Sequence, residues 1–197
     1  FIVEQGAEAF KKLGSENNYG FKLFGVSGCV NKPGVYEYPM GVSFSELMQA
    51  AGGVKGTLKA AIVGGLSVAI LKAEELQDLR MDYDSCAEHG TGLGSGGIMV
   101  INTEFSIPDL ALRTAQFYAH ESCGKCVPCK EGSYTLVQIL KNILAGNGTV
   151  DDIDNILRVC NTVRGGLSLC PTGEAFSVPV GAMVSKFRDE FEALIKK

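Results

Sequence analysis

Three cysteines in one short turn are the residues whose type and spacing best suit chemistry in this chain. Cys123, Cys126 and Cys129 repeat every three residues, and Gly124 and Pro128 supply bends between them. Such a turn brings three sulfurs together around one small inorganic group. The group then needs a fourth ligand from elsewhere in the chain.

Cys170 is the strongest candidate for that fourth ligand. Pro171 follows it directly, and residues 130–169 are enough to fold as helices and bring the chain back. The pattern Cys-x2-Cys-x2-Cys with a remote Cys-Pro favours a 4Fe-4S cluster, in which each iron takes one thiolate. Zinc sites usually take their ligands as two separated pairs, so zinc is a weaker alternative, and disulfides are weaker still.

The other cysteines and the two histidines lack the spacing of metal ligands. Cys160 falls on the apolar face of an expected helix, where a buried thiol is the default, and Cys29 and Cys86 have no cysteine partner. His120 either closes a helix or contacts the metal group, whereas His89 is expected to be solvated. No Ser/His/Asp set or phosphate-binding loop is found, so we expect electron transfer without catalytic or organic-cofactor-binding residues.

Length and composition exclude several classes of protein. A chain of 197 residues holds one or two domains with their own cores, so no metal is needed merely to fold. A net charge of -4 argues against nucleic acid as a partner. Neither a long apolar run nor an export signal is present, so we expect no membrane insertion. Seven cysteines, an odd number, fit a reducing compartment, and we expect a cytoplasmic protein.

The first half of the chain has the pattern of a small mixed sheet. Ser43 and Glu46 form a capping box, and Gly52-Gly53 stops the short helix that follows it. A hairpin followed by such a helix is the beginning of a β-grasp arrangement. The strands are expected at residues 21–30, 35–38, 60–63, 68–71 and 98–101.

The glycine-rich segment 92–97 contains the G-x-G-x-x-G string of dinucleotide-binding folds. That fingerprint works only where a strand precedes it and a helix follows, because the helix N-terminus must face the pyrophosphate. Here residues 98–101 are an expected strand. We therefore predict a glycine-rich turn that enters the last strand of the sheet.

The second half has helical periodicity and predicts a four-helix bundle. The cysteine segments 123–129 and 170 would lie in loops between helices, at one end of the bundle. The expected helices begin at the Ser106 cap, after Cys129, at the Thr149 cap with Asp152, and after Pro179.

The segment Glu121–Cys129, with Phe117–His120 before it, resembles the NADH-binding flavoprotein subunit of respiratory complex I. Related members of that family are the β subunits of NAD-linked hydrogenases and formate dehydrogenases. The resemblance implies that Cys123, Cys126, Cys129 and Cys170 hold a 4Fe-4S cluster that takes electrons from flavin. Further matching segments run through the whole chain in the family's order, at 25–28, 31–36, 93–97 and 187–191.

The resemblance also implies an α+β chain in three parts. Residues 1–20 would be the tail of a missing flavin and NADH domain with a linker, 21–104 a soluble-ligand-binding β-grasp (SLBB) domain, and 105–197 the helical cluster domain. FMN and NAD(H) would bind only in the missing domain, since its glycine-rich Gly-Arg-Gly-Gly-Gly-Phe-type motif does not occur here. This chain alone would then have no catalytic site for NADH.

The partners implied by the resemblance are the chain's own missing flavin domain, a 2Fe-2S thioredoxin-like subunit and a larger iron-sulfur subunit. The complex would place the chain at the periphery of the inner membrane. Two departures from the family pattern are Lys130, where Arg is usual, and Pro171-Thr172, where Ala-Leu is frequent. The sequence does not decide whether these departures mark the hydrogenase or the formate dehydrogenase branch of the family.

We therefore expect an electron-transfer module of an NADH-linked oxidoreductase. The alternative is a β-grasp module for ligand binding or subunit interaction with a structural metal site. Apolar residues beside the ligands would form an exposed docking patch or shield the cluster from water. These residues are Val127, Pro128, Pro171 and Phe176.

Overall fold

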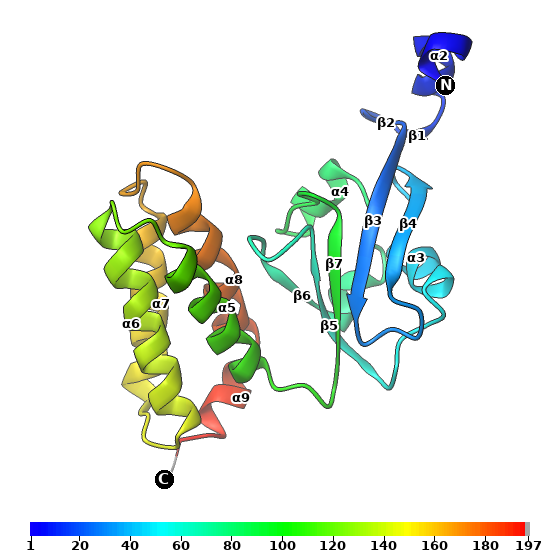
Figure 1. Cartoon of the computed structure of the whole chain (residues 1–197). Helices are drawn as coiled ribbons and strands as arrows, with labels where there is room; N and C mark the ends of the chain where they lie inside the picture. The colour runs from blue at the N-terminus through cyan, green and yellow to red at the C-terminus, as the bar shows by residue number, and fades with distance from the viewer. Residues whose placement is uncertain (196–197) are drawn as a thin grey trace. The chain divides into compact units, whose positions relative to one another are not determined.

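The chain divides into two compact units, Phe1–Glu104 and a second that begins at Phe105. The structure is a computed structural model that describes residues 1–195. Figure 1 shows strands and short helices in the first unit and longer helices in the second.

The first unit contains a five-stranded sheet in the order β4-β3-β7-β5-β6. β3 pairs with β7 in parallel, and the other pairs are antiparallel. A hairpin next to a parallel last strand at the sheet centre is the β-grasp arrangement that the sequence predicted. The strand bounds are β3 Phe21–Gly28, β4 Gly34–Pro39, β5 Leu58–Val63, β6 Ile70–Lys72 and β7 Gly97–Asn102.

Helix α3 (Phe44–Ala50) covers one face of this sheet, and the predicted capping box at its start is confirmed. The Ser43 side chain accepts from the Glu46 N–H, and the Glu46 carboxylate accepts from the Ser43 N–H. Phe44 and Leu47 of α3 are buried in the same core cluster as strand residues on the facing side of the sheet. A core of this kind stabilises the unit by roughly 25 cal/mol per Å² of apolar surface removed from water.

A short hairpin precedes the sheet, after helices α1 (Ile2–Gln5) and α2 (Ala7–Lys11). Its strands are β1 (Gly14–Ser15) and β2 (Asn18–Tyr19), where the sequence had indicated only a polar break. Two side-chain hydrogen bonds fix the hairpin to the start of α4 (Tyr83–Glu88). They join Ser15 Oγ to Asp82 Oδ2 at 2.9 Å and Asn18 Nδ2 to Asp84 Oδ2 at 2.7 Å.

Two short helical elements of the first unit were not predicted. They are α4 and the 3-10 helix η1 (Ala73–Leu76). Asp82 caps α4 by accepting from the Ser85 N–H at 2.8 Å, so a start signal was present in the sequence. The helix is too short to show a periodic apolar face, which is why the pattern did not indicate it.

The second unit is the predicted bundle of four longer helices, followed by a short one. α5 packs against α6 and α8, and α7 packs against α6 and α8. Figure 1 shows these helices side by side, with consecutive helices running in opposite directions. The bounds are α5 Ile107–Glu121, α6 Val127–Leu144, α7 Val150–Arg164, α8 Thr172–Lys186 and α9 Arg188–Glu192. Mixed helix and sheet in separate parts make the chain an α+β protein, as predicted.

The caps of α5 and α7 are confirmed, but the start of the last long helix is a correction. Ser106 and Thr149 cap their helices through their side chains. The sequence placed the last helix after Pro179, whereas α8 begins at Thr172 and contains that proline. Beside the proline, the Arg164 guanidinium donates to two backbone carbonyls of α8, at 2.7 and 3.0 Å. This contact ties α7 to α8 beside a residue that usually interrupts a helix.

No helix within residues 1–195 is long and apolar enough to cross a membrane.

Candidate metal centre

Both cysteine segments lie at the same end of the helical bundle. The turn between α5 and α6 carries Cys123, and the turn between α7 and α8 carries Cys170. Cys126 is the N-cap residue of α6 and Cys129 lies in its first turn, so Cys129 is helical and not in a loop as expected. The reason is Pro128, which fits the first helical turn because an N–H is not needed there.

A hydrogen bond between the two turns brings these segments into contact. The backbone N–H of Leu169 donates to Cys126 Sγ at 3.3 Å. Leu169 directly precedes Cys170, so the sulfur of one predicted ligand is held beside the segment that carries another. The four thiols differ in exposure: Cys123 and Cys170 are exposed, Cys126 is partly buried, and Cys129 is buried.

Hydroxyl groups lie beside two of the four sulfurs. Ser122 Oγ is 3.5 Å from Cys129 Sγ, and Thr172 Oγ1 is 3.3 Å from Cys170 Sγ. Hydrogen bonds with the Thr172 side chain and backbone hold the pKa of the Cys170 thiol below its usual value. The sequence interpretation missed both hydroxyl residues, although each lies close in sequence to a predicted ligand.

Helix geometry adds a favourable field for negatively charged sulfur at this end. α6 and α8 both begin here, and the N-terminus of a helix carries a partial positive charge. Cys126 and Cys129 lie at the first of these N-termini, and Cys170 lies just before the second. A thiolate, and not a thiol, is the form that binds a metal.

The donor set suits an iron-sulfur cluster in type and in placement. It supplies four thiols from two turns that are in contact, and iron-sulfur clusters are held by cysteine thiolates. Within residues 1–195, however, no group of three or more His, Cys, Asp or Glu side chains lies close enough together to hold a metal ion. The four ligands therefore stay a prediction, supported by their common location.

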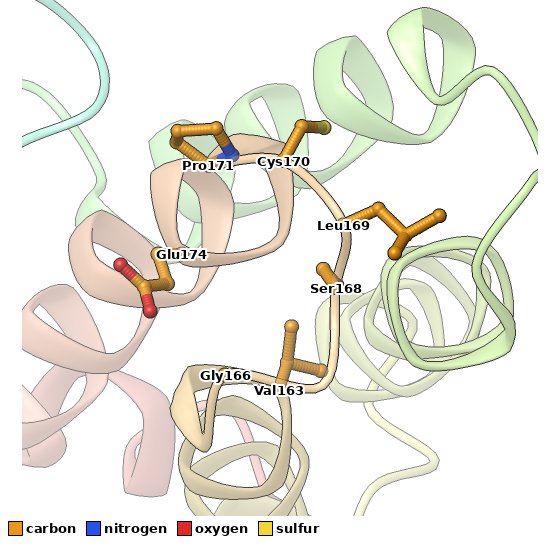
Figure 2. Close-up of a pocket in the computed structure, with 7 residues that line it drawn as sticks. All are labelled: Val163, Gly166, Ser168, Leu169, Cys170, Pro171 and Glu174. Atoms are coloured by element: carbon orange, nitrogen blue, oxygen red, sulfur yellow. The ribbon is translucent and has the colours of Figure 1, made fainter.

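A pocket of about 230 Å³ lies inside the turn between α7 and α8, next to Cys170. Figure 2 shows Val163 and Ser168 directed into the space that this turn encloses and Leu169 directed away from it. Ser168 Oγ is buried, and it lacks a hydrogen-bond partner in the described part of the chain. The lining residues are Val163, Gly166, Ser168, Leu169, Cys170, Pro171 and Glu174.

Cys160 and Cys86 have different surroundings from the four cysteines at the bundle end. Burial raises the pKa of the Cys160 thiol to about 12 and that of the Cys86 thiol to about 11. Both therefore stay protonated near neutral pH, which agrees with their interpretation as structural thiols. His120 lies in the last turn of α5 with Nδ1 3.0 Å from Glu121 Oε1. His89 Nδ1 is 2.8 Å from the Ser85 carbonyl oxygen.

The expected apolar patch beside the ligands is only partly correct. Phe176 is fully buried among the helices and does not belong to a surface. Val127 is 71% exposed, as a docking patch requires, and Leu167 and Leu169 are 58% and 82% exposed. The sequence could not separate these cases, because both kinds of residue are apolar and close to cysteines.

The glycine-rich string is a turn that leads into a strand, as predicted. Gly97 begins β7, so no helix N-terminus follows the glycines. The turn is closed by backbone: a Cβ on Gly64 would lie 1.9 Å from the Gly92 carbonyl oxygen, and one on Gly94 would lie 2.2 Å from the Gly64 carbonyl oxygen. The glycines are needed for this close approach of two backbone segments.

Comparison with known proteins gives two matching family models. Residues 109–194 match the NADH-ubiquinone oxidoreductase-F iron-sulfur binding region, and residues 23–68 match the SLBB domain. The first range contains all four predicted ligands.

Full-length relatives and solved structures agree with these models. The chain is 41% identical over 199 residues to the F subunit of NADH-quinone oxidoreductase from Rickettsia rickettsii and 40% identical to that from Rickettsia felis. These alignments cover 99% of this chain and 47% of each relative, so the chain spans about half of their length. A crystal structure of an NAD+-reducing [NiFe]-hydrogenase matches with a TM-score of 0.88 and 31% identity, over 99% of this chain and 33% of that one.

The resemblance seen in the sequence is thereby confirmed. The chain is similar to part of the NADH-quinone oxidoreductase F subunits, and it matches the models of the iron-sulfur binding region of that family and of the SLBB domain.

Proposed function

We propose that this chain is the electron-transfer module of an NADH-linked oxidoreductase. A 4Fe-4S cluster bound here would accept electrons one at a time from the FMN of a flavin domain and pass them to partner subunits. The observation that carries the proposal is the pair of cysteine turns at one end of the bundle, joined by the hydrogen bond from Leu169 N–H to Cys126 Sγ. The matching iron-sulfur family model supports the same cofactor.

The roles of this chain's own residues follow from their positions. Cys123, Cys126, Cys129 and Cys170 would hold the cluster, the N-termini of α6 and α8 would favour the charged sulfurs, and the bundle would fix the two turns. When bound, the cluster supplies reversible storage of one electron. No side chain of this chain is assigned a bond-making step.

The individual partners of the module belong to the same proposal. They are a flavin domain that carries FMN and binds NAD(H), a 2Fe-2S thioredoxin-like subunit and a larger iron-sulfur subunit. The relatives are named as subunits, and they are about twice as long as this chain, which supports a place within a larger assembly. We propose a cytoplasmic location, peripheral to the inner membrane as part of that assembly. Residues 1–20, 21–104 and 105–197 are proposed as tail, SLBB domain and cluster domain.

Anaerobic purification followed by iron, sulfide and zinc analysis tests the proposal directly. We expect about four irons and four sulfides per chain. Low-temperature electron paramagnetic resonance after dithionite treatment should show a reduced cluster, and a one-electron oxidant should reverse the change. Zinc without sulfide would overturn the cofactor assignment. A cluster that is reduced only when the chain unfolds would indicate a structural metal site instead of electron transfer.

A further inference from the structure

We propose that a set of hydrogen-bond donors on the cysteine sulfurs sets the reduction potential of the cluster. The inference rests on the proposed function and adds to it the residues of this chain that tune it. The groups, called here the sulfur donors, are the Leu169 N–H, which donates to Cys126, and the hydroxyls of Ser122 and Thr172, which lie beside Cys129 and Cys170. In the structure the Cys170 thiol donates to Thr172 Oγ1; a metal-bound thiolate has no proton, so both hydroxyls would then be the donors.

The Ser122 hydroxyl would donate to Cys129 Sγ once a metal is bound. Its Oγ is 3.5 Å from Cys129 Sγ and also accepts from the Gly124 N–H at 3.4 Å. A ligand thiolate has no proton, so the hydroxyl is the donor of this pair once a metal is bound. Cys129 is only 7% exposed, and a hydrogen bond is electrostatically stronger where water is excluded.

The Leu169 donor comes from the backbone of the other turn. Its N–H is 3.3 Å from Cys126 Sγ, whereas its side chain is 82% exposed. The contribution of this residue to the sulfur is therefore its peptide N–H, and the side chain is not needed for it.

The third sulfur donor is the Thr172 hydroxyl. Thr172 Oγ1 lies 3.3 Å from Cys170 Sγ, and the residue between them, Pro171, has no N–H to offer. A ligand thiolate has no proton, so the hydroxyl becomes the donor of this pair once a metal is bound.

Reduction of a bound cluster adds one electron and breaks no bond, so its cost depends on how well the added negative charge is stabilised. Hydrogen bonds to the sulfurs stabilise that charge, and they are among the determinants of cluster potential. Loss of a sulfur donor should therefore make the potential more negative. The effect should be larger at buried Cys129 than at exposed Cys170, where water replaces the lost donor.

The test is an anaerobic redox titration of the cluster-loaded chain, with dithionite and ferricyanide as titrants and paramagnetic resonance as the readout. Ser122→Ala and Thr172→Val remove the hydroxyls, and Ser122→Thr and Thr172→Ser are the matched controls that retain them. For Ser122→Ala we expect the equilibrium constant for reduction to fall on the order of tenfold, which is about 59 mV for a one-electron couple. For Thr172→Val we expect a fall of about threefold, and the controls should stay close to the unmodified chain.

A backbone variant extends the test to the Leu169 N–H. Leu169→Pro removes the N–H, and Leu169→Ala keeps it, so only the first should lower the potential.

The outcomes separate this proposal from the one it rests on. Unchanged potentials in Ser122→Ala and Thr172→Val, with normal iron content, would overturn the tuning role and leave the electron-transfer function standing. A chain that binds no iron or sulfide would overturn both. If Ser122→Ala loses its cluster during purification, the Thr172 pair at the exposed sulfur decides: a shift supports the proposal, and equal potentials refute it.

Discussion

The glycine turn at residues 92–97 and the cysteine turns at the bundle end are two compact loops with very different surroundings. The glycine turn is filled by its own backbone, because Gly64 and Gly94 approach neighbouring carbonyl groups more closely than any side chain would allow. The cysteine turns instead leave Cys123 and Cys170 exposed and are joined through a sulfur. A loop that is filled by backbone atoms has a structural role. A loop with exposed sulfur atoms is suited to binding a ligand.

Among the variants considered, Cys170→Ser should change the metal content of the cysteine turns most. Because a hydroxyl is a poor substitute for a thiolate on iron, we expect Cys170→Ser to lose the cluster and to loosen the two turns. Iron and sulfide analysis after anaerobic purification, together with a thermal melt, measures both changes. An unchanged iron content would remove Cys170 from the ligand set.

Cys160→Ala is the matched control for that experiment, because the thiol lies in the core of the bundle and is 1% exposed. Its iron content should equal that of the unmodified chain. A small cavity should lower the free energy of unfolding by about 1 kcal/mol.

Thiol labelling of the cluster-free chain should distinguish the two kinds of cysteine by pH. The thiolate reacts with iodoacetamide, so a lower pKa means that labelling begins at lower pH. Labelling of Cys170 should have its midpoint below 9.0, the usual pKa of a thiol, whereas Cys86 and Cys160 have pKa values of about 11 and about 12. Mass spectrometry of separated peptides gives each profile. Thr172→Val should move the Cys170 midpoint upward, and a midpoint that stays in place would contradict the role of that hydroxyl.

Gly64→Ala should destabilise the first unit and leave the metal centre unaffected. Gly64 has a φ of 105°, and an added Cβ would meet the Gly92 carbonyl oxygen at 1.9 Å. We expect the free energy of unfolding to fall by about 2–4 kcal/mol, measured by urea denaturation. The control is Gly90→Ala, where φ is 69° and no atom lies within 4 Å of the added Cβ, so only about 1 kcal/mol of backbone strain remains. Equal losses in the two variants would show that the backbone approach at Gly64 is unimportant.

NADH should produce no detectable change in the 197-residue chain by itself. The glycine turn leads into strand β7 and not into a helix, and hydride transfer needs an organic cofactor that accepts two electrons. The loss of NADH absorbance with ferricyanide as acceptor measures the oxidation, and the full-length F subunit of a relative is the positive control. Turnover together with tightly bound FMN would contradict this expectation.

Local signals explain most of what the sequence predicted correctly. The capping boxes at Ser43 and Thr149 and the cap at Ser106 depend on residues three positions apart, so they can be recognised without tertiary information. The same holds for the glycine string, where the aliphatic residues that follow indicate a strand. The cysteine spacing favoured a 4Fe-4S cluster, and the resemblance to a family implied the same cluster together with the flavin that would supply its electrons.

The errors arose where contacts distant in sequence decide the structure. Pro179 favours a helix start by local preference, but α8 continues through it, with Arg164 of α7 donating to carbonyl groups beside it. Phe176 is apolar and close to a ligand, and only the packing of the bundle shows that it is buried. Ser122 and Thr172 have ordinary sequence surroundings, and their relation to sulfur becomes visible only when the turns are built.

The four long helices run in alternating directions, so the length of one helix sets the distance between the two ends of the bundle. α6 is 18 residues long, so the turn after it lies about 27 Å from its N-terminal cysteines at 1.5 Å per residue. Asn147 is exposed in that turn. A spin label attached there would report its separation from a paramagnetic centre at the opposite end by pulsed dipolar spectroscopy. That measurement would locate the centre within the protein without a crystal.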